Sequence, residues 1–253
     1  MVGIYFSGTG NSRHVLEMFL QAYDETAKAF SIEDTQVLRE VQEQDELVFA
    51  YPVQYSTLPK IVRDFVLENK TLWNGKQVFV IATMGLFSGD GAGVLARLLQ
   101  KCGAKIVGGV HLKMPDSIGD EKVLKRPCEK NVELVRRAEQ KARRAAEALK
   151  AGQPPREGLG LLSRMAGLFG QRLYFGYKTK NYSDKLKIDP KKCVGCGKCA
   201  ALCPMKNIEV KDGACTAGKQ CTMCYRCINY CPKQAITLLG KAVVEQSVIE
   251  KYL

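Results

Sequence analysis

The chain has 253 residues, of which 46% are hydrophobic, and a formal net charge of +12. This length allows one large domain, or a medium domain and a small one. No segment approaches the roughly 20 apolar residues of a membrane span. The start, Met1 to Phe6, has neither the basic residues nor the long apolar run of a secretory signal. We therefore expect a cytoplasmic protein with no membrane span.

Short apolar runs and helical patterns alternate along the first part of the chain. Five runs rich in Val, Ile, Phe and Ala are typical of strands buried on both faces of a parallel sheet. They are Val2–Phe6, Ala27–Ile32, Glu46–Tyr51, Lys76–Thr83 and Lys105–His111. The helical patterns between and after them are Asn11–Tyr23, Pro59–Glu68, Ala92–Cys102 and Cys128–Lys150. The alternation predicts a doubly wound, five-stranded α/β domain over residues 1–152.

The loop between the first strand and the first helix is suited to a phosphate group. It reads Ser7-Gly8-Thr9-Gly10-Asn11-Ser12. Its glycines permit tight backbone geometry, its polar side chains offer donors, and the helix start adds free N–H groups and a positive dipole end. It has neither the Lys of a P-loop nor the G-x-G-x-x-G spacing of a dinucleotide fold. We expect a phosphate monoester held by neutral donors.

This loop resembles the FMN-phosphate loop of flavodoxins. The resemblance implies the strand order 2-1-3-4-5, with FMN at the switch between the first and third strands. It also places flavin contacts in the loops after the third and fourth strands, with Tyr55 and Phe87 as candidates to pack on the ring. The implied FMN-binding residues are Ser7, Thr9, Gly10, Asn11, Ser12, Pro52, Val53, Gln54, Tyr55, Thr83, Met84, Gly85 and Phe87. The alternatives are a flavodoxin-like domain with an empty or altered site, or a different phosphate ligand.

A basic segment includes the last predicted helix of this domain and continues beyond it. Residues 121–192 hold 19 Lys and Arg against 8 Asp and Glu, a net of +11, whereas residues 1–120 hold 11 against 14, a net of −3. We expect residues 153–184 to connect two domains and the charges to form a solvated helix face. The sharper hypothesis is a docking surface for an acidic redox partner. Nucleic acid is not expected, because no base-stacking aromatics or binding motif accompany the charge.

A short amphipathic stretch, residues 159–169, lies within this connector. Such a stretch could lie on a membrane surface. We expect it instead to cover the seam between the two domains, because apolar surface is usually buried there.

Nine of the 11 cysteines fall between residues 193 and 231, and eight of these nine form two runs that each read C-x2-C-x2-C-x3-C-P. A [4Fe–4S] cluster needs four soft thiolates, so two complete runs at a fixed offset are a specific signal for two clusters. A zinc site built from C-x2-C pairs would leave the third cysteine of each run unused. Disulfides conflict with the reducing compartment that we expect.

The two runs resemble those of bacterial two-cluster ferredoxins, in which the fourth cysteine of each run binds the other cluster. The resemblance implies a small α+β ferredoxin domain over residues 185–240, followed by a tail over 241–253. One implied cluster has the ligands Cys193, Cys196, Cys199 and Cys231, and the other has Cys203, Cys221, Cys224 and Cys227. We expect Cys102, Cys128 and Cys215 to be small buried residues rather than ligands.

The combined architecture resembles flavodoxin–ferredoxin fusion proteins of anaerobic bacteria and archaea. The resemblance implies an electron-transfer protein that passes electrons between two [4Fe–4S] clusters and FMN, and on to a redox partner. The alternatives are a flavin-dependent reductase of a quinone or nitro compound, fed through the clusters, and a redox-sensing binding module. The sequence favours a carrier over a substrate-specific enzyme without deciding between them. We expect the two histidines, His14 and His111, to be structural.

Overall fold

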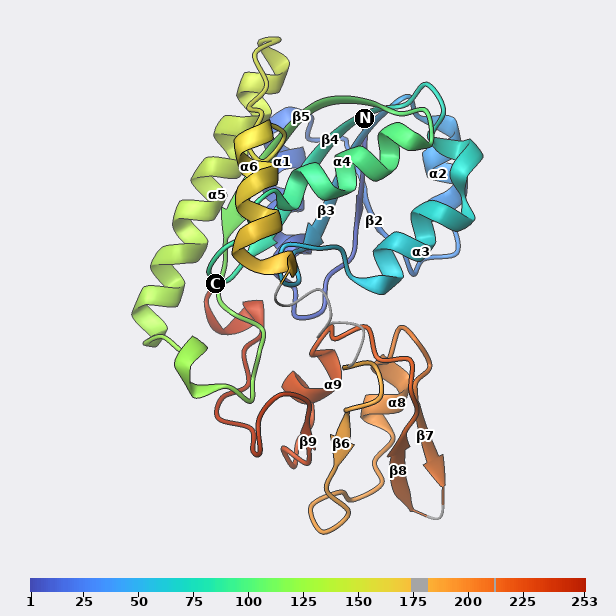
Figure 1. Cartoon of the computed structure of the whole chain (residues 1–253), viewed down its shortest axis with the longest axis vertical. Coiled ribbons are helices and arrows are strands. Elements are labelled where there is room, and N and C mark those ends of the chain that lie inside the picture. The colour runs from blue at the N-terminus through green and yellow to red at the C-terminus, as the bar shows by residue number, and fades with distance from the viewer. Residues whose placement is uncertain (174–181, 212) are drawn as a thin grey trace.

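The computed structural model describes residues 1–173, 182–211 and 213–253. Residues 174–181, in the predicted connector, lie outside these ranges. Figure 1 shows a larger N-terminal domain, built on a sheet with helices around it, and a smaller C-terminal domain at one edge of that sheet.

Five parallel strands form the sheet of the N-terminal domain. They are β1 (Val2–Tyr5), β2 (Ala29–Ser31), β3 (Glu46–Pro52), β4 (Gln77–Met84) and β5 (Lys105–Lys113). The order is β2-β1-β3-β4-β5 and every neighbouring pair is parallel. The predicted doubly wound class and strand order are therefore confirmed. The order reverses between β1 and β3, and this switch leaves a crevice at the carboxyl edge of the sheet.

Helices cover both faces of the sheet (Figure 1). On one face lie α1 (Asn11–Tyr23) and α5 (Cys128–Lys150), and on the other lie α2 (Val37–Glu43), α3 (Lys60–Glu68), the short turn η1 (Lys70–Trp73) and α4 (Gly91–Lys101). Along β3, Leu47, Phe49 and Tyr51 pack toward the second face, whereas Val48 and Ala50 pack toward the first. Burial on both faces explains why the strands read as continuous apolar runs.

The C-terminal domain contains two antiparallel strand pairs and two short helices. The pairs are β6 (Lys187–Ile188) with β9 (Ile236–Thr237), and β7 (Ile208–Lys211) with β8 (Ala214–Ala217). The helices are α8 (Lys198–Leu202) and α9 (Arg226–Asn229), and each starts two residues after the second cysteine of a run. Together these elements give the small α+β domain that the cysteine runs predicted.

The stretch after α5 forms α6 (Leu161–Gly167), which continues into the π-helical turn η3 (Leu168–Arg172). The expectation that its apolar residues cover the domain seam is wrong, because Leu161, Leu162 and Phe169 are exposed. The physical reason is the identity of the inner residue. Gly167 lies against Gly89 and Asp90, where no larger residue fits, so the apolar face is turned outward.

Polar contacts dock the C-terminal domain on the carboxyl edge of the sheet. Arg226 of α9 forms a bidentate ion pair with Glu33, with N–O distances of 2.7 and 2.8 Å, and also donates to the carbonyl of Ser7 at 2.9 Å. Asp120 Oδ2, in the segment between β5 and the 3-10 turn η2 (Lys122–Leu124), accepts three backbone N–H bonds of 2.6–3.1 Å from residues 238–240. The two domains are therefore held in one fixed arrangement.

The last residues return to the N-terminal domain. The 3-10 turn η4 (Ile249–Lys251) lies against the first loop, where the N–H of Ile249 donates to the carbonyl of Thr9 at 2.9 Å. Ile249 and Tyr252 are buried in the core that α1 and α5 share. The segment predicted as a tail thus fastens the C-terminal domain to the sheet.

Candidate cofactor sites

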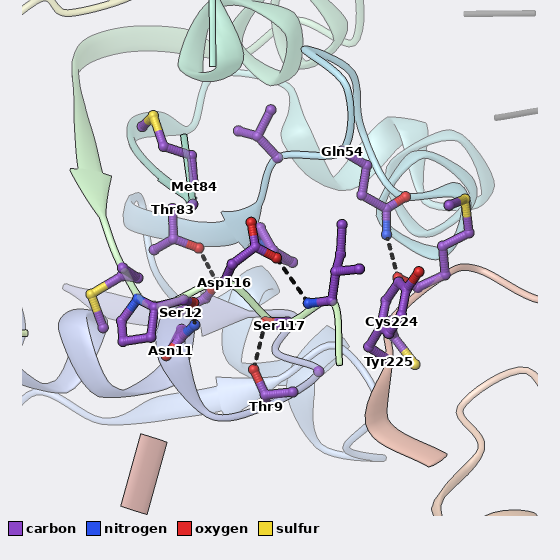
Figure 2. A pocket seen from close by; sticks show the side chains of 18 of the residues that line it. Thr9, Asn11, Ser12, Gln54, Thr83, Met84, Asp116, Ser117, Cys224 and Tyr225 are labelled. Atoms are coloured by element: carbon purple, nitrogen blue, oxygen red, sulfur yellow. Dashed lines mark hydrogen bonds between the residues drawn. The ribbon is translucent and has the colours of Figure 1, made fainter. Parts of the chain in front are cut away.

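A cavity opens at the carboxyl edge of the sheet, between the two domains (Figure 2). Its volume is about 190 Å³, and it is partly open to solvent. Twelve of the thirteen residues predicted to bind FMN line it, namely Ser7, Thr9, Asn11, Ser12, Pro52, Val53, Gln54, Tyr55, Thr83, Met84, Gly85 and Phe87. The exception is Gly10, which precedes α1 with a φ of 90° and faces Ile249.

The first loop is tied to its neighbours by side-chain hydrogen bonds. The hydroxyls of Thr9 and Ser117 lie 2.7 Å apart, and those of Ser12 and Thr83 also lie 2.7 Å apart (Figure 2). No side chain caps the start of α1, so the helix presents its free N–H groups beside the loop. Neutral donors and an uncapped helix start fit the phosphate of FMN.

The second loop makes a tight turn between Gln54 and Thr57. The backbone groups of these two residues bond each other at 2.8 and 3.1 Å, and Tyr55 and Ser56 both have a positive φ, of 48° and 56°. Residues other than Gly pay roughly 1–3 kcal/mol for such conformations, which occur mainly at ligand sites. Burial raises the pKa of Tyr55 to about 12, so its hydroxyl stays protonated. The turn presents Tyr55 to the cavity.

Besides the loops after β1, β3 and β4, a fourth loop, missed by the sequence analysis, also contributes to the cavity. It follows β5 and brings in Asp116, whose Oδ1 accepts the N–H of Ile118 at 2.8 Å (Figure 2). Burial raises the pKa of Asp116, and the cations Lys125 and Arg126 partly oppose this. A Cβ at Gly85 would lie 2.1 Å from Asp116 Oδ2, so only Gly leaves room for the carboxylate. The polar pair Asp116-Ser117, which begins five residues after the end of the fifth predicted strand, was the available signal.

The C-terminal domain supplies the remaining wall of the cavity, with Met223, Cys224 and Tyr225. The carbonyl of Cys224 lies against Gly8, where a Cβ would be only 2.0 Å from its oxygen. Gln54 Nε2 donates to the carbonyls of Thr222 and Met223 at 2.9 and 3.1 Å. The second cysteine run therefore touches the first and second loops of the cavity. No local sequence signal predicts this contact, because it depends on how two domains dock.

The eight cysteines of the two runs are gathered in two smaller cavities. One is lined by Cys203, Cys221, Cys224 and Cys227, and the other by Cys193, Cys196, Cys199 and Cys231. In the described ranges, no group of three or more His, Cys, Asp or Glu is placed to hold a single metal ion. A cubane takes one thiolate on each iron, so it fits four spaced cysteines around a cavity.

The other three cysteines differ from one another. Cys215, on β8, is buried as expected and lines the same cavity as Cys193 and Cys199. Cys102 is partly buried against the core. The prediction for Cys128 is wrong, because it is exposed; it is the first residue of α5, ahead of the turn that packs on the sheet.

Both histidines make contacts within the N-terminal domain. His14 Nε2 lies 2.7 Å from Glu139 and so links α1 to α5. His111 Nδ1 lies 2.9 Å from the hydroxyl of Ser88, and its Nε2 accepts the N–H of Ala92 at 3.1 Å. Neither lines the cavity at the sheet edge or the two cysteine cavities.

Comparisons with known families agree with this geometry. Residues 3–106 match the family model of a flavodoxin domain, and residues 185–232 match that of a 4Fe-4S dicluster domain. The chain is a fusion of these two domains. It is therefore an electron-transfer protein. The flavodoxin domain implies FMN, and the dicluster domain implies iron–sulfur clusters. No curated protein matches the chain.

Solved structures similar to this chain include several flavodoxins. A two-electron reduced flavodoxin of Megasphaera elsdenii is 23% identical, with a TM-score of 0.41, over 57% of this chain and 100% of that one. Flavodoxin 1 of Bacillus cereus is 22% identical, with a TM-score of 0.39, over 59% and 96%. A flavodoxin of Streptococcus pneumonia TIGR4 is 20% identical, with a TM-score of 0.40, over 59% and 97%. Among the described helices of the fusion, none combines the length and apolarity needed to cross a membrane.

Proposed function

We propose that the protein carries electrons between two [4Fe–4S] clusters and one FMN, and exchanges them with a separate redox protein in the cytoplasm. The observation that supports this proposal is that two neighbouring cavities share lining residues. Cys224 and Tyr225 line both the cavity at the sheet edge and one cysteine cavity. Clusters exchange single electrons and a flavin takes one or two, so adjoining sites form a path between them.

The chain's own residues divide the work of holding the cofactors. The Ser7–Ser12 loop and the uncapped start of α1 would bind the phosphate. The turn at Tyr55, residues 83–87 and Asp116 would surround the ring. Residues 1–152 form the flavin unit and 185–240 the cluster unit, with the last residues fastened back to the first loop.

Each cysteine cavity would hold one cluster. We call the cavity at the sheet edge the flavin cavity. We assign Cys203, Cys221, Cys224 and Cys227 to the inner cluster, which adjoins this cavity. We assign Cys193, Cys196, Cys199 and Cys231 to the outer cluster. Each set contains the fourth cysteine of the other run, which supports the crossed ligation.

The outer cluster lies at a surface suited to an acidic redox partner. Lys198 and Lys233 line its cavity, Lys192 directly precedes Cys193, and all three lysines are exposed. Cys196 and the neighbouring Val194 are exposed between them, which brings a thiolate ligand to the surface. Basic charge around such a point raises the rate of encounter with an acidic protein. We therefore place electron entry here rather than on the basic face of α5.

Removal of one ligand at each cluster tests the path. The purified wild-type protein should contain about eight irons per chain, and Cys196→Ala and Cys224→Ala should each contain about four. Mixed anaerobically with a reduced acidic two-cluster ferredoxin, the wild type should show rapid reduction of its flavin absorbance, and both variants should lose it. Flavin reduction that persists at the wild-type rate in Cys224→Ala would refute the path.

A charge-reversal experiment locates the entry point. Lys198→Glu with Lys233→Glu should slow reduction by the same ferredoxin about tenfold at low salt. The matched control, Arg136→Glu with Arg144→Glu on the exposed face of α5, should leave the rate within twofold. The reverse pattern would place the partner on α5.

One observation favours a second function, reduction of a small acceptor. The exposed apolar residues Leu86 and Phe87 form part of the lining of the flavin cavity, which is partly open to solvent. A quinone or nitro compound could reach the ring there. Steady turnover of such an acceptor with reduced ferredoxin, at a rate that exceeds cluster oxidation by the acceptor in flavin-free protein, would establish this activity.

A further inference from the structure

The helix formed by α6 and η3 turns its apolar face to the solvent. Leu161 is 71% exposed, Leu162 86% and Phe169 62%, and Met165 and Leu173 are also exposed. These positions recur every three or four residues, so they share one face of the helix. A helix on a water-soluble domain normally directs such a face to the core, and here the orientation is reversed.

Close packing on the other side fixes this orientation. A Cβ at Gly167 would lie 2.1 Å from Asp90 Oδ1, and one at Gly89 would lie 2.4 Å from Gly167 Cα. Rotation of the helix to bury the leucines would push a side chain into this contact. The outward apolar face is therefore built into the packing of the helix on the domain.

The helix that carries the apolar face lies beside the mouth of the flavin cavity. Gly170 lies beside the ring of Phe87, because a Cβ on Gly170 would be 3.4 Å from Phe87 Cε1. Phe87 and Leu86 are both about half exposed and both line the cavity. Figure 1 shows the gold helix running past the sheet and ending near the seam between the domains. The helix thus brings its outward apolar face close to the exposed residues at the mouth of the cavity.

The charge beside this surface is positive. Arg156 and Arg164 are exposed and line one groove together with Leu161. They belong to residues 121–192, which carry a net charge of +11. Anionic lipid attracts such side chains. A second copy of the chain would bring the same positive charge, so charge complementarity favours an anionic lipid surface.

We propose that the outward face of α6 and η3 lies in the headgroup region of an anionic membrane and holds the mouth of the flavin cavity against the bilayer. Five large apolar side chains bordered by arginines are the features of an interfacial helix. Electron transfer between the cofactors neither requires nor predicts lipid binding, so this proposal stands or falls separately from the proposed function.

Vesicle sedimentation of the full-length, cofactor-loaded protein tests the proposal. The vesicles are pure phosphatidylcholine or a two-to-one mixture of phosphatidylcholine and phosphatidylglycerol. We expect binding to the mixed vesicles, weakened by salt, and little binding to the neutral ones. Leu162→Glu with Phe169→Glu should weaken binding about tenfold or more. These side chains are exposed, so the flavin and cluster spectra should be unchanged.

The matched control is Val123→Glu, because Val123 in η2 is also 86% exposed but lies outside the apolar face. It should bind as the wild type does. Absence of binding to mixed vesicles, equal binding to neutral vesicles, or undiminished binding of the double variant would each overturn the proposal. A wild-type dimer in ultracentrifugation that Leu162→Glu with Phe169→Glu converts to a monomer would assign the face to self-association instead.

Discussion

The outer loop, residues 193–199, and the inner loop, residues 221–227, each carry the first three cysteines of one run. Two matching positions in these loops have the same backbone conformation but different residues. In the outer loop Gly195 and Gly197 have φ values of 64° and 71°, and in the inner loop Met223 and Tyr225 have φ values of 55° and 59°. A residue with a side chain pays roughly 1–2 kcal/mol for this conformation. Both inner side chains form the wall of the flavin cavity. At these two positions, the strain thus falls on the loop that lines the flavin cavity.

At the same scale, Gly8 sets the contact between the flavin loop and the inner cysteine loop. Gly8→Ala would place a Cβ 2.0 Å from the carbonyl oxygen of Cys224. We expect the overpacking to destabilise the protein by about 1–3 kcal/mol and to release FMN. Equilibrium urea unfolding and the flavin content after gel filtration measure the two effects.

The control for Gly8→Ala is Gly160→Ala. Gly160 has a φ of −77° and no atom within 4 Å of the position of an added Cβ. It should retain FMN and change stability by less than about 0.5 kcal/mol. Equal losses in the two variants would show that the contact at Cys224 is not the cause.

His111 predicts a pH dependence of stability. Burial lowers its pKa below the ordinary value of 6.5. The unfolded chain then binds a proton at a higher pH than the folded chain does, so this contribution is complete above about pH 6.5 and is lost as the pH falls through the lower, folded-state pKa. The free energy of unfolding, measured from pH 8 to pH 5, should fall more steeply below pH 6.5 for the wild type than for His111→Gln. Parallel curves would contradict this assignment.

At the scale of elements, the predictable part of the site lies where a loop follows a strand. The loop after β1 was predicted from its own residues, and the loops after β3 and β4 were predicted from the resemblance to flavodoxins. Asp116 was missed although the polar pair Asp116-Ser117 carries the same kind of signal after β5. The seven residues of α2 were too few for a periodic pattern.

Other elements were beyond local prediction. The apolar periodicity of α6 was visible, but its outward direction depends on Gly167 meeting Asp90, a contact across more than 70 residues of sequence. Met223 and Tyr225 reach the flavin cavity only because α9 docks on the sheet. Sequence patterns report which residues share a face of an element, and tertiary packing decides what that face meets.

The ion pair between Glu33 and Arg226 joins the sheet side to α9. Its side chains are 26% and 16% exposed. Glu33→Gln should lower the free energy of unfolding by about 1–3 kcal/mol, because it weakens two charge-assisted hydrogen bonds in a partly buried setting. Glu43→Gln is the control, since its pair with Arg39 is exposed and should be worth under about 0.5 kcal/mol. Urea unfolding of the cofactor-loaded protein measures both losses of free energy. Equal losses in the two variants would argue against a stabilising contact between Glu33 and α9.

At the scale of the whole molecule, the flavin site is complete only when both domains are docked. Three of the residues that line it come from the inner cysteine loop. Chelation of iron after mild oxidation should disorder that loop and weaken FMN binding by about tenfold or more, equivalent to about 1.4 kcal/mol. Flavin fluorescence in the ultrafiltrate measures the release.

Cys196→Ala provides the control for this release. It removes a ligand of the outer cluster, whose cavity shares no residue with the flavin cavity. We expect it to retain FMN at the wild-type level. Release of flavin to the same extent from Cys196→Ala and from the chelated protein would mean that the whole domain unfolds rather than the inner loop alone.

The contact between Gly8 and Cys224 also implies an order of maturation. We expect the inner loop to be disordered without iron, so a newly made chain would lack one wall of its flavin site and bind FMN more weakly. Iron–sulfur assembly would then come first and flavin loading second. In a cell short of iron, less flavin would be committed to a protein unable to exchange its electrons.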